Sequence, residues 1–112
     1  MGLFVLPHIQ AQLDAESGNK GTFTVAFEPD TVINVLYISQ DDEVIGTASG
    51  ITKKGRKFVL PKGDYTAALR FHAESGTQGK LTITQPDGTV RSRTGKVAKP
   101  NKSRTLRRTF SV

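Results

Sequence analysis

Short runs of alternating apolar and polar residues, separated by glycine and proline, predict an all-β protein. The 112 residues include 11 Gly and 5 Pro, a content that favours many turns over long helices. The segment 60–71 joins a Pro-Lys-Gly turn to an alternating strand, as Greek-key sandwiches do repeatedly. Together these features predict one antiparallel β-sandwich domain spanning residues 1–112, with jelly-roll or immunoglobulin-like Greek-key topology and about eight strands.

The first half of the chain contains four expected strands. Residues 9–16 and 22–28 alternate apolar with polar side chains, so each of these strands is expected to have one solvated face. Residues 32–38 are almost continuously apolar or β-branched, which predicts a central strand covered on both faces. A two-residue Asp-Asp connection then leads to residues 43–48, and the two strands are expected to form a hairpin.

The corner at residues 60–71 dominates the second half. Tyr65 is expected to be a structural anchor, with its hydroxyl bonded back to upstream backbone and its ring on the apolar face of a strand over residues 64–73. Further strands are expected over residues 57–60, 80–84, 90–97 (a polar strand at a sheet edge) and 104–112.

Four motifs between Val32 and Thr84 carry a resemblance to a known family. They are Val35-Leu36-Tyr37-Ile38, Asp41-Asp42-Glu43-Val44-Ile45, Leu60-Pro61-Lys62-Gly63-Asp64-Tyr65 and Gly79-Lys80-Leu81-Thr82-Ile83. In this span, about half of the chain, the sequence resembles bacterial pre-peptidase C-terminal-type domains. The resemblance implies a jelly-roll-like sandwich with the binding or auxiliary role that such domains have beside secreted enzymes. An immunoglobulin-like or fibronectin-like sandwich would carry much the same corner.

The sequence contains few residues suited to catalysis. It has no Cys and two His, His8 and His72, and it carries no nucleophile elbow, P-loop, zinc-type spacing or dinucleotide glycine fingerprint. His72 shares a strand face with Glu74 and could pair with it, although a surface histidine is the stronger interpretation. The acidic triplet 41–43 could bind Ca²⁺ and Lys62-Gly63-Asp64 looks like an integrin-binding tripeptide, but a solvated tip and a turn explain them better. We therefore expect a non-enzymatic protein with no catalytic residue, no metal site and no cofactor.

The N-terminus carries no targeting signal that we can identify. Residues 1–7 are apolar but lack the basic region, the full apolar core and the cleavage pattern of a signal peptide. No stretch approaches the roughly 18 apolar residues of a membrane helix, so no membrane insertion is expected. The lack of cysteine favours a cytoplasmic protein or a soluble phage or bacterial product, and a secreted mature form stays open as an alternative.

The net charge of +6 conceals a strong asymmetry along the chain. Residues 1–52 contain one Lys against seven acids, a net charge of −6, whereas residues 53–112 contain 15 Lys and Arg against three acids, a net charge of +12. Towards the C-terminus a series of basic residues is interrupted by no acid. The candidate contact residues are Arg91, Arg93, Lys96, Lys99, Lys102, Arg104, Arg107 and Arg108.

Three interpretations of this asymmetry follow from electrostatics. Acidic and basic strands can be neighbours that balance each other within one molecule. The basic residues can instead contact a protein partner or an acidic surface of a second copy in a homo-oligomer. They can also bind a polyanion such as nucleic acid, but Phe110 is the only aromatic residue in this region, and base stacking needs such rings. Among binding functions the sequence favours a protein-interaction module.

Carbohydrate binding is the alternative typical of many small β-sandwiches. Sugar platforms need exposed aromatic rings, and the chain has no Trp. Both tyrosines, Tyr37 and Tyr65, are expected to serve the core or the corner. The sequence therefore ranks a carbohydrate ligand below a protein partner.

Overall fold

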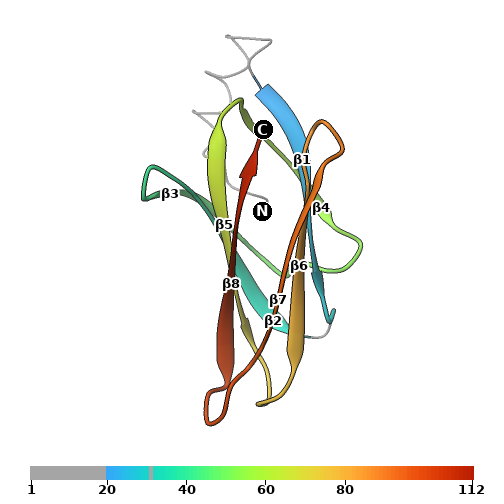
Figure 1. The fold of residues 1–112 in the computed structure, drawn as a ribbon, viewed down its shortest axis with the longest axis vertical. Coiled ribbons are helices and arrows are strands. Elements are labelled where there is room, and N and C mark those ends of the chain that lie inside the picture. Colours follow the sequence, from blue (N-terminus) through green and yellow to red (C-terminus); the bar gives the residue numbers. More distant parts are fainter. Residues whose placement is uncertain (1–19, 31) are drawn as a thin grey trace.

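The computed structural model describes residues 20–30 and 32–112, and the expected strand over residues 9–16 lies outside them. The described residues form eight strands in two four-stranded antiparallel sheets that pack face to face (Figure 1). The strands are β1 (Lys20–Glu28), β2 (Ile33–Gln40), β3 (Glu43–Ser49), β4 (Arg56–Pro61), β5 (Asp64–His72), β6 (Gln78–Thr84), β7 (Val90–Lys96) and β8 (Ser103–Ser111). The predicted all-β sandwich is confirmed.

The chain crosses repeatedly between the two sheets. Sheet A has the strand order β4-β1-β6-β7, and sheet B has the order β3-β2-β5-β8. Strands β7 and β8 end the two sheets on the same side of the sandwich and lie beside each other, while β3 and β4 are the opposite edge strands. The predicted edge position of residues 90–97 is therefore confirmed. Within residues 20–30 and 32–112 there is no helix of the length and apolarity needed to cross a membrane.

Aromatic pairs join the two sheets through one core. Phe23, Val25 and Phe27 of β1 are buried, as their alternation predicted. The ring of Phe27 packs against Phe71 of β5 with centroids 5.1 Å apart, and Phe23 packs against Phe110 of β8 at 4.8 Å. Tilted aromatic contacts of this kind add to the stabilisation that comes from buried area. Because β1 belongs to sheet A and the partners belong to sheet B, these pairs fix the sheets against each other.

The corner between β4 and β5 has the predicted geometry. The Tyr65 hydroxyl donates a 2.7 Å hydrogen bond to the carbonyl oxygen of Pro61, and the ring is buried against Phe110 with centroids 5.7 Å apart. Burial raises the pKa of the Tyr65 hydroxyl, and the side chain of Gln40 lowers it to a smaller extent. Tyr65 is therefore a structural anchor, as the sequence predicted.

Strand β2 differs from the prediction of a strand covered on both faces. It is internal to sheet B, but only Asn34, Leu36 and Ile38 are buried. Ile33 is 74% exposed and Tyr37 is 36% exposed on the solvated face. An internal strand of a two-layer sandwich keeps one face in solvent even where its residues are apolar. The expected core position of Tyr37 is therefore wrong.

The β2–β3 hairpin turns through two residues in the left-handed region. Asp41 has a φ of 53° and Asp42 a φ of 65°. Two consecutive positive φ angles define a type I′ turn, in which Gly is the favoured second residue. A register shift between Ile38 and Ser39 adds a bulge that bends the hairpin. Figure 1 shows the hairpin projecting from the body of the sandwich.

Candidate functional site

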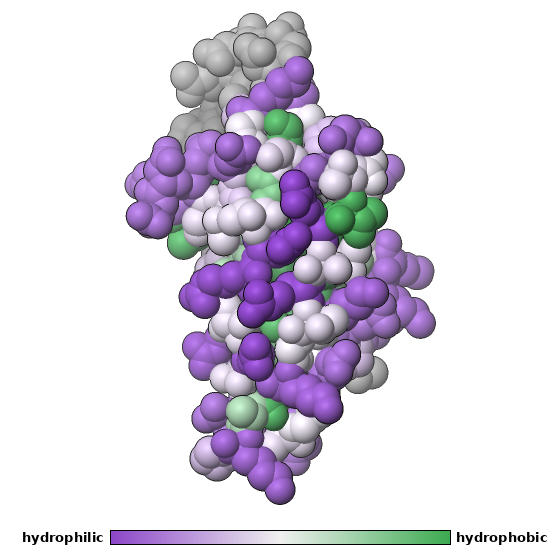
Figure 2. Space-filling model, viewed as in Figure 1, coloured by the Kyte–Doolittle hydropathy of each residue, from purple (hydrophilic) through white to green (hydrophobic). Residues whose placement is uncertain are grey.

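The basic residues singled out in the sequence lie on two neighbouring edge strands and their connection. Figure 2 shows strongly hydrophilic side chains along the middle of the face that β7 and β8 occupy in Figure 1. Arg91, Arg93 and Lys96 belong to β7, Lys99 and Lys102 to the connection, and Arg104, Arg107 and Arg108 to β8.

Four of the arginines start on the core side of their sheets. Arg91 and Arg93 are opposite two buried residues of β6, and Arg104 and Arg108 are opposite two buried residues of β5. A long charged side chain on an edge strand can reach water by extending past the rim of the core. These side chains therefore emerge between β7 and β8, and we term the four residues the arginine seam.

Hydrogen bonds hold two of the seam arginines in place. The Nη1 of Arg104 donates to the carbonyl oxygen of Lys96 at 2.9 Å, from β8 to β7. The Nε of Arg91 donates to Oε1 of the buried Gln85 at 3.2 Å. The same Oε1 accepts the backbone N–H of Ser111 at 2.9 Å, so Gln85 ties the β6–β7 turn to the end of β8. The seam is thus an ordered part of the fold.

Little negative charge compensates this side of the sandwich. In the part of the chain that the structure describes, the one ion pair joins Lys102 Nζ to Glu74 Oε2 at 3.0 Å, and both side chains are so exposed that the pair contributes little. The Nε of Arg108 is buried without a hydrogen-bond partner in that same part of the chain. We term the following residues of β7, β8 and their connection the basic face, in which Lys96 projects from the solvated side of sheet A: Arg91, Arg93, Lys96, Lys99, Lys102, Arg104 and Arg108.

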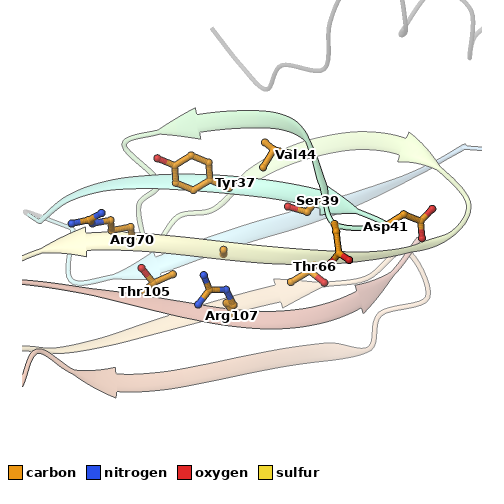
Figure 3. A pocket seen from close by; sticks show the side chains of 10 residues that line it. Tyr37, Ser39, Asp41, Val44, Thr66, Arg70, Thr105 and Arg107 are labelled. Atoms are coloured by element: carbon orange, nitrogen blue, oxygen red, sulfur yellow. The ribbon is translucent and has the colours of Figure 1, made fainter.

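Arg107 does not belong to the basic face. It lies on the solvated side of sheet B, in a cross-strand row with Ala68 of β5 and Tyr37 of β2. The short Ala68 side chain leaves a depression between the Tyr37 ring and the Arg107 guanidinium (Figure 3). This depression, which we term the sheet-B hollow, has a volume of about 560 Å³, within the range of ligand sites.

The two ends of the sheet-B hollow carry opposite charges. Arg70 and Arg107 lie towards one end and Asp41 lies at the other (Figure 3), where its neighbour in the turn, Asp42, also lines the hollow. Arg70 donates a hydrogen bond of 3.3 Å to the hydroxyl of Ser103, and neither arginine has an ion pair within the described residues. The hydroxyl-bearing side chains Ser39 of β2 and Thr66 of β5 lie between the charged ends, and Thr105 of β8 lies opposite Arg70 at the cationic end. The hollow is therefore polar and dipolar.

Asp41, Asp42 and Glu43 also form an acidic tip on the β2–β3 hairpin. All three side chains are exposed, and within residues 20–30 and 32–112 none of them has a side-chain hydrogen bond or an ion pair. By contrast, the Asp30 carboxylate accepts the backbone N–H of Lys53 at 2.7 Å. The acidic tip is the largest cluster of acidic side chains without an ion pair among the described residues.

The sequence candidates for acid–base and metal chemistry lie in open positions. His72 is exposed, and the carboxylate of Glu74 pairs with Lys102 rather than with His72. Within the described ranges no group of three His, Asp or Glu side chains is placed to hold a metal ion. The backbone N–H of Thr89 donates to Asp87 at 2.9 Å and lowers the pKa of that carboxyl, which is a turn contact.

Sequence reasoning missed the sheet-B hollow. The available signal was the alternation in β5, where Thr66, Ala68 and Arg70 occupy the positions between buried residues. It was overlooked because Tyr37 stands in an apolar run and was assigned to the core. With Tyr37 on the solvated face, one aromatic ring and two arginines surround a floor of small side chains.

Comparisons of the chain with protein families, with curated proteins and with solved structures found no match. The resemblance to pre-peptidase C-terminal-type domains therefore stays a sequence-based expectation, and any functional proposal depends on the geometry described above.

Proposed function

We propose that this protein is a non-enzymatic interaction module that associates through complementary charge, with the basic face of one copy binding the acidic tip of another. The observation that carries the proposal is the placement of these surfaces. The acidic tip joins β2 to the edge strand β3, and β8, which carries part of the basic face, is the opposite edge of sheet B. A contact between unlike surfaces on opposite edges is head-to-tail and can repeat from copy to copy.

Some charged residues elsewhere in the part of the chain that the structure describes have oppositely charged neighbours or hydrogen bonds within the fold, whereas the acidic tip and most of the basic face do not. Glu28 is opposite Lys80 in the β1–β6 ladder, and Asp30 bonds the backbone of Lys53. Glu28 and Lys80 are thus cross-strand neighbours of opposite charge that form no ion pair among the described residues, and the Asp30 carboxylate is held by a backbone N–H. The acidic tip and most of the basic face have no such partner among the described residues. Surplus charge of opposite sign on two surfaces steers the encounter of two molecules and sets their register.

The charges also specify which edges can meet. Edge strands have unpaired backbone groups on one side and are prone to pair with other strands. Two β8 edges bring arginines together and repel, and two acidic hairpins repel in the same way. A β3 edge and a β8 edge attract. The arrangement therefore favours a single kind of contact.

A nucleic-acid partner has less support. Base stacking needs exposed aromatic side chains. Phe110, the aromatic residue of β8, is 2% exposed and belongs to the core. Binding to a protein surface that presents carboxylates requires charge pairing and no exposed aromatic rings.

The mass in solution across a salt series tests the proposal. At about 0.01 M salt the Debye length is about 30 Å, and at 1 M it is about 3 Å. We expect sedimentation to give a mass above that of the 12.2 kDa chain at low salt, falling to that of the single chain at high salt. Reversing three exposed charges of the basic face (Arg93→Glu, Lys96→Glu, Lys99→Glu) should abolish the association. The matched control reverses three exposed lysines elsewhere (Lys53→Glu, Lys54→Glu, Lys57→Glu) and should leave it intact.

A mixing experiment distinguishes the head-to-tail contact from general charge attraction. The variant Asp41→Asn/Asp42→Gly/Glu43→Gln keeps only the basic face, and the triple Glu variant of the basic face keeps only the acidic tip. Each should be a single chain alone. Together they can form one complementary interface, so the mixture should reach two copies and stop there.

Two results would overturn the proposal: a single chain at every salt concentration, or equal loss of association in the control variant. Steep, salt-dependent retention of a monomeric protein on heparin would assign the basic face to a polyanion instead.

A further inference from the structure

We propose that the sheet-B hollow binds a hydroxylated ligand that carries a single carboxylate, of the class of a short saccharide with one uronic acid. The hollow shares Asp41 and Asp42 with the acidic tip, but its arginines and Tyr37 lie outside both association surfaces, so variants at those positions test ligand binding separately. The proposal rests on the charges, the hydroxyl groups and the exposed ring of the hollow.

The cationic end of the hollow suits one carboxylate. Arg70 and Arg107 stand on neighbouring strands, one step apart diagonally in the β5–β8 register, because Arg70 is opposite Thr105 and Arg107 is opposite Ala68. Diagonal neighbours of this kind lie within reach of the same small group. Guanidinium groups bind carboxylates through strong charge-assisted hydrogen bonds. Neither arginine forms an ion pair with a carboxylate among the described residues.

The anionic end selects against highly charged ligands. Asp41 and Asp42 balance the two arginines, so the hollow has no net charge from these four residues. A phosphate or a sulfated chain would gain at one end and be repelled at the other. Carboxylates accept hydrogen bonds from neutral hydroxyl groups at little cost. A ligand with one acid group and several hydroxyls therefore matches both ends.

Tyr37 supplies the apolar component. Tyr37 is 36% exposed, and its cross-strand neighbour in β5 is Ala68, so a flat ligand can lie on the floor beside the ring. Sites for small ligands combine such a ring with a few convergent polar groups. Val44, which is 54% exposed on β3, closes the same side of the hollow (Figure 3). Hydroxyls of Ser39 and Thr66 lie farther along the floor.

The left-handed turn places the anionic end. Asp41 and Asp42 hold positive φ angles in a turn where Gly is favoured at the second position. Strained backbone is frequent at binding sites, where a particular side chain has to be presented. Both aspartates line the hollow, so the strained turn places two carboxylates where a bound ligand would contact them.

Binding of a matched pair of disaccharides tests the proposal. Cellobiouronic acid carries one carboxylate, and cellobiose is its neutral counterpart. Titration followed by amide chemical shifts should show saturable binding of the acid, with the largest shifts in β2 and β5, and binding at least about tenfold weaker for the neutral sugar. Arg70→Gln and Tyr37→Ala should each weaken binding of the acid about tenfold. Both residues lie outside the acidic tip and the basic face, so the mass in solution should not change.

Arg93→Gln is the matched control, because it removes the same charge from β7 and should leave binding unchanged. Three outcomes would overturn the proposal: no saturable binding of cellobiouronic acid, equal weakening by Arg93→Gln and Arg70→Gln, or equally tight binding of inorganic sulfate, which would mean a general anion site. Since Arg70 and Tyr37 lie outside the association surfaces, failure here leaves the salt-dependent mass as an independent result.

Discussion

Strands β3 and β8 both end sheet B, yet they differ in charge, in packing and in backbone strain. β8 carries arginines, contributes Leu106 and Phe110 to the core, and is tied to sheet A through Gln85. β3 follows a strained acidic turn and leaves Val44 more than half exposed. The two edges therefore contribute differently to the stability of the sandwich. β8 is a structural edge that also presents charge, whereas β3 presents charge with little contribution to the core.

The largest expected effect is a difference in the free energy of unfolding when an apolar side chain is truncated on β8 or on β3. Phe110→Ala should lower the free energy of unfolding by about 3–5 kcal/mol, because it removes a buried ring that contacts Phe23 and Tyr65. Val44→Ala on β3 should change it by less than about 0.5 kcal/mol. Chemical denaturation measures both. Similar losses at the two positions would contradict the contrast between the edges.

The link between β8 and sheet A is the next test. Gln85→Ala should cost about 1–3 kcal/mol, because Gln85 is buried and its Oε1 accepts from both Arg91 and Ser111. Gln78→Ala, at an exposed position on β6, is the control and should be close to neutral. If denaturation showed equal stability for the two variants, Gln85 would not be a tie between the sheets.

The corner that leads into β5 should respond to pH. Tyr65→Phe should cost about 0.5–1.5 kcal/mol at neutral pH through loss of the bond to Pro61. Burial raises the pKa of Tyr65 in the folded protein, so the folded state holds its proton more tightly than the unfolded chain. This contribution is complete below the unfolded value, about 10, and is lost as pH rises through the folded pKa. Unfolding measured from pH 8 to 11 should therefore show a steeper loss in the natural protein than in Tyr65→Phe, and parallel curves would refute the argument.

The smallest expected effect is a stabilisation, in contrast to the losses above, and it concerns the turn that leads into β3. Asp41→Asn with Asp42→Gly installs the pair that a type I′ turn favours and should raise the free energy of unfolding by about 0.5 kcal/mol, because relief of the left-handed strain exceeds the greater unfolded-state entropy of Gly. Thermal unfolding at high salt measures this with charge effects screened. Gly88→Ala in the β6–β7 turn, where φ is 89°, is a control that should destabilise. A less stable Asn-Gly variant would mean that the aspartates stabilise the turn through contacts of their own.

Much of the fold was predictable because its signals are local. Phe23, Val25 and Phe27 alternate with polar residues and are buried, and Tyr65 follows a Pro-Lys-Gly turn and bonds back to Pro61. The basic residues could also be named in advance, since charge is read directly from the chain. Tyr37 was misplaced for a physical reason: apolar content does not show which face of a strand the second sheet covers.

By itself the sequence determined the class of the fold, the corner and the acidic and basic segments, because alternation, turn chemistry and charge belong to neighbouring residues. The alternation in β8 already puts Arg107 on the opposite face from Arg104 and Arg108, but its row with Ala68 and Tyr37 came from the tertiary structure. That row joins three strands far apart in the chain, and its register is set by how the cores of both sheets pack. The same packing put the acidic hairpin and β8 at opposite edges of one sheet. The sequence shows which residues are charged, and the fold determines on which surface each of them lies.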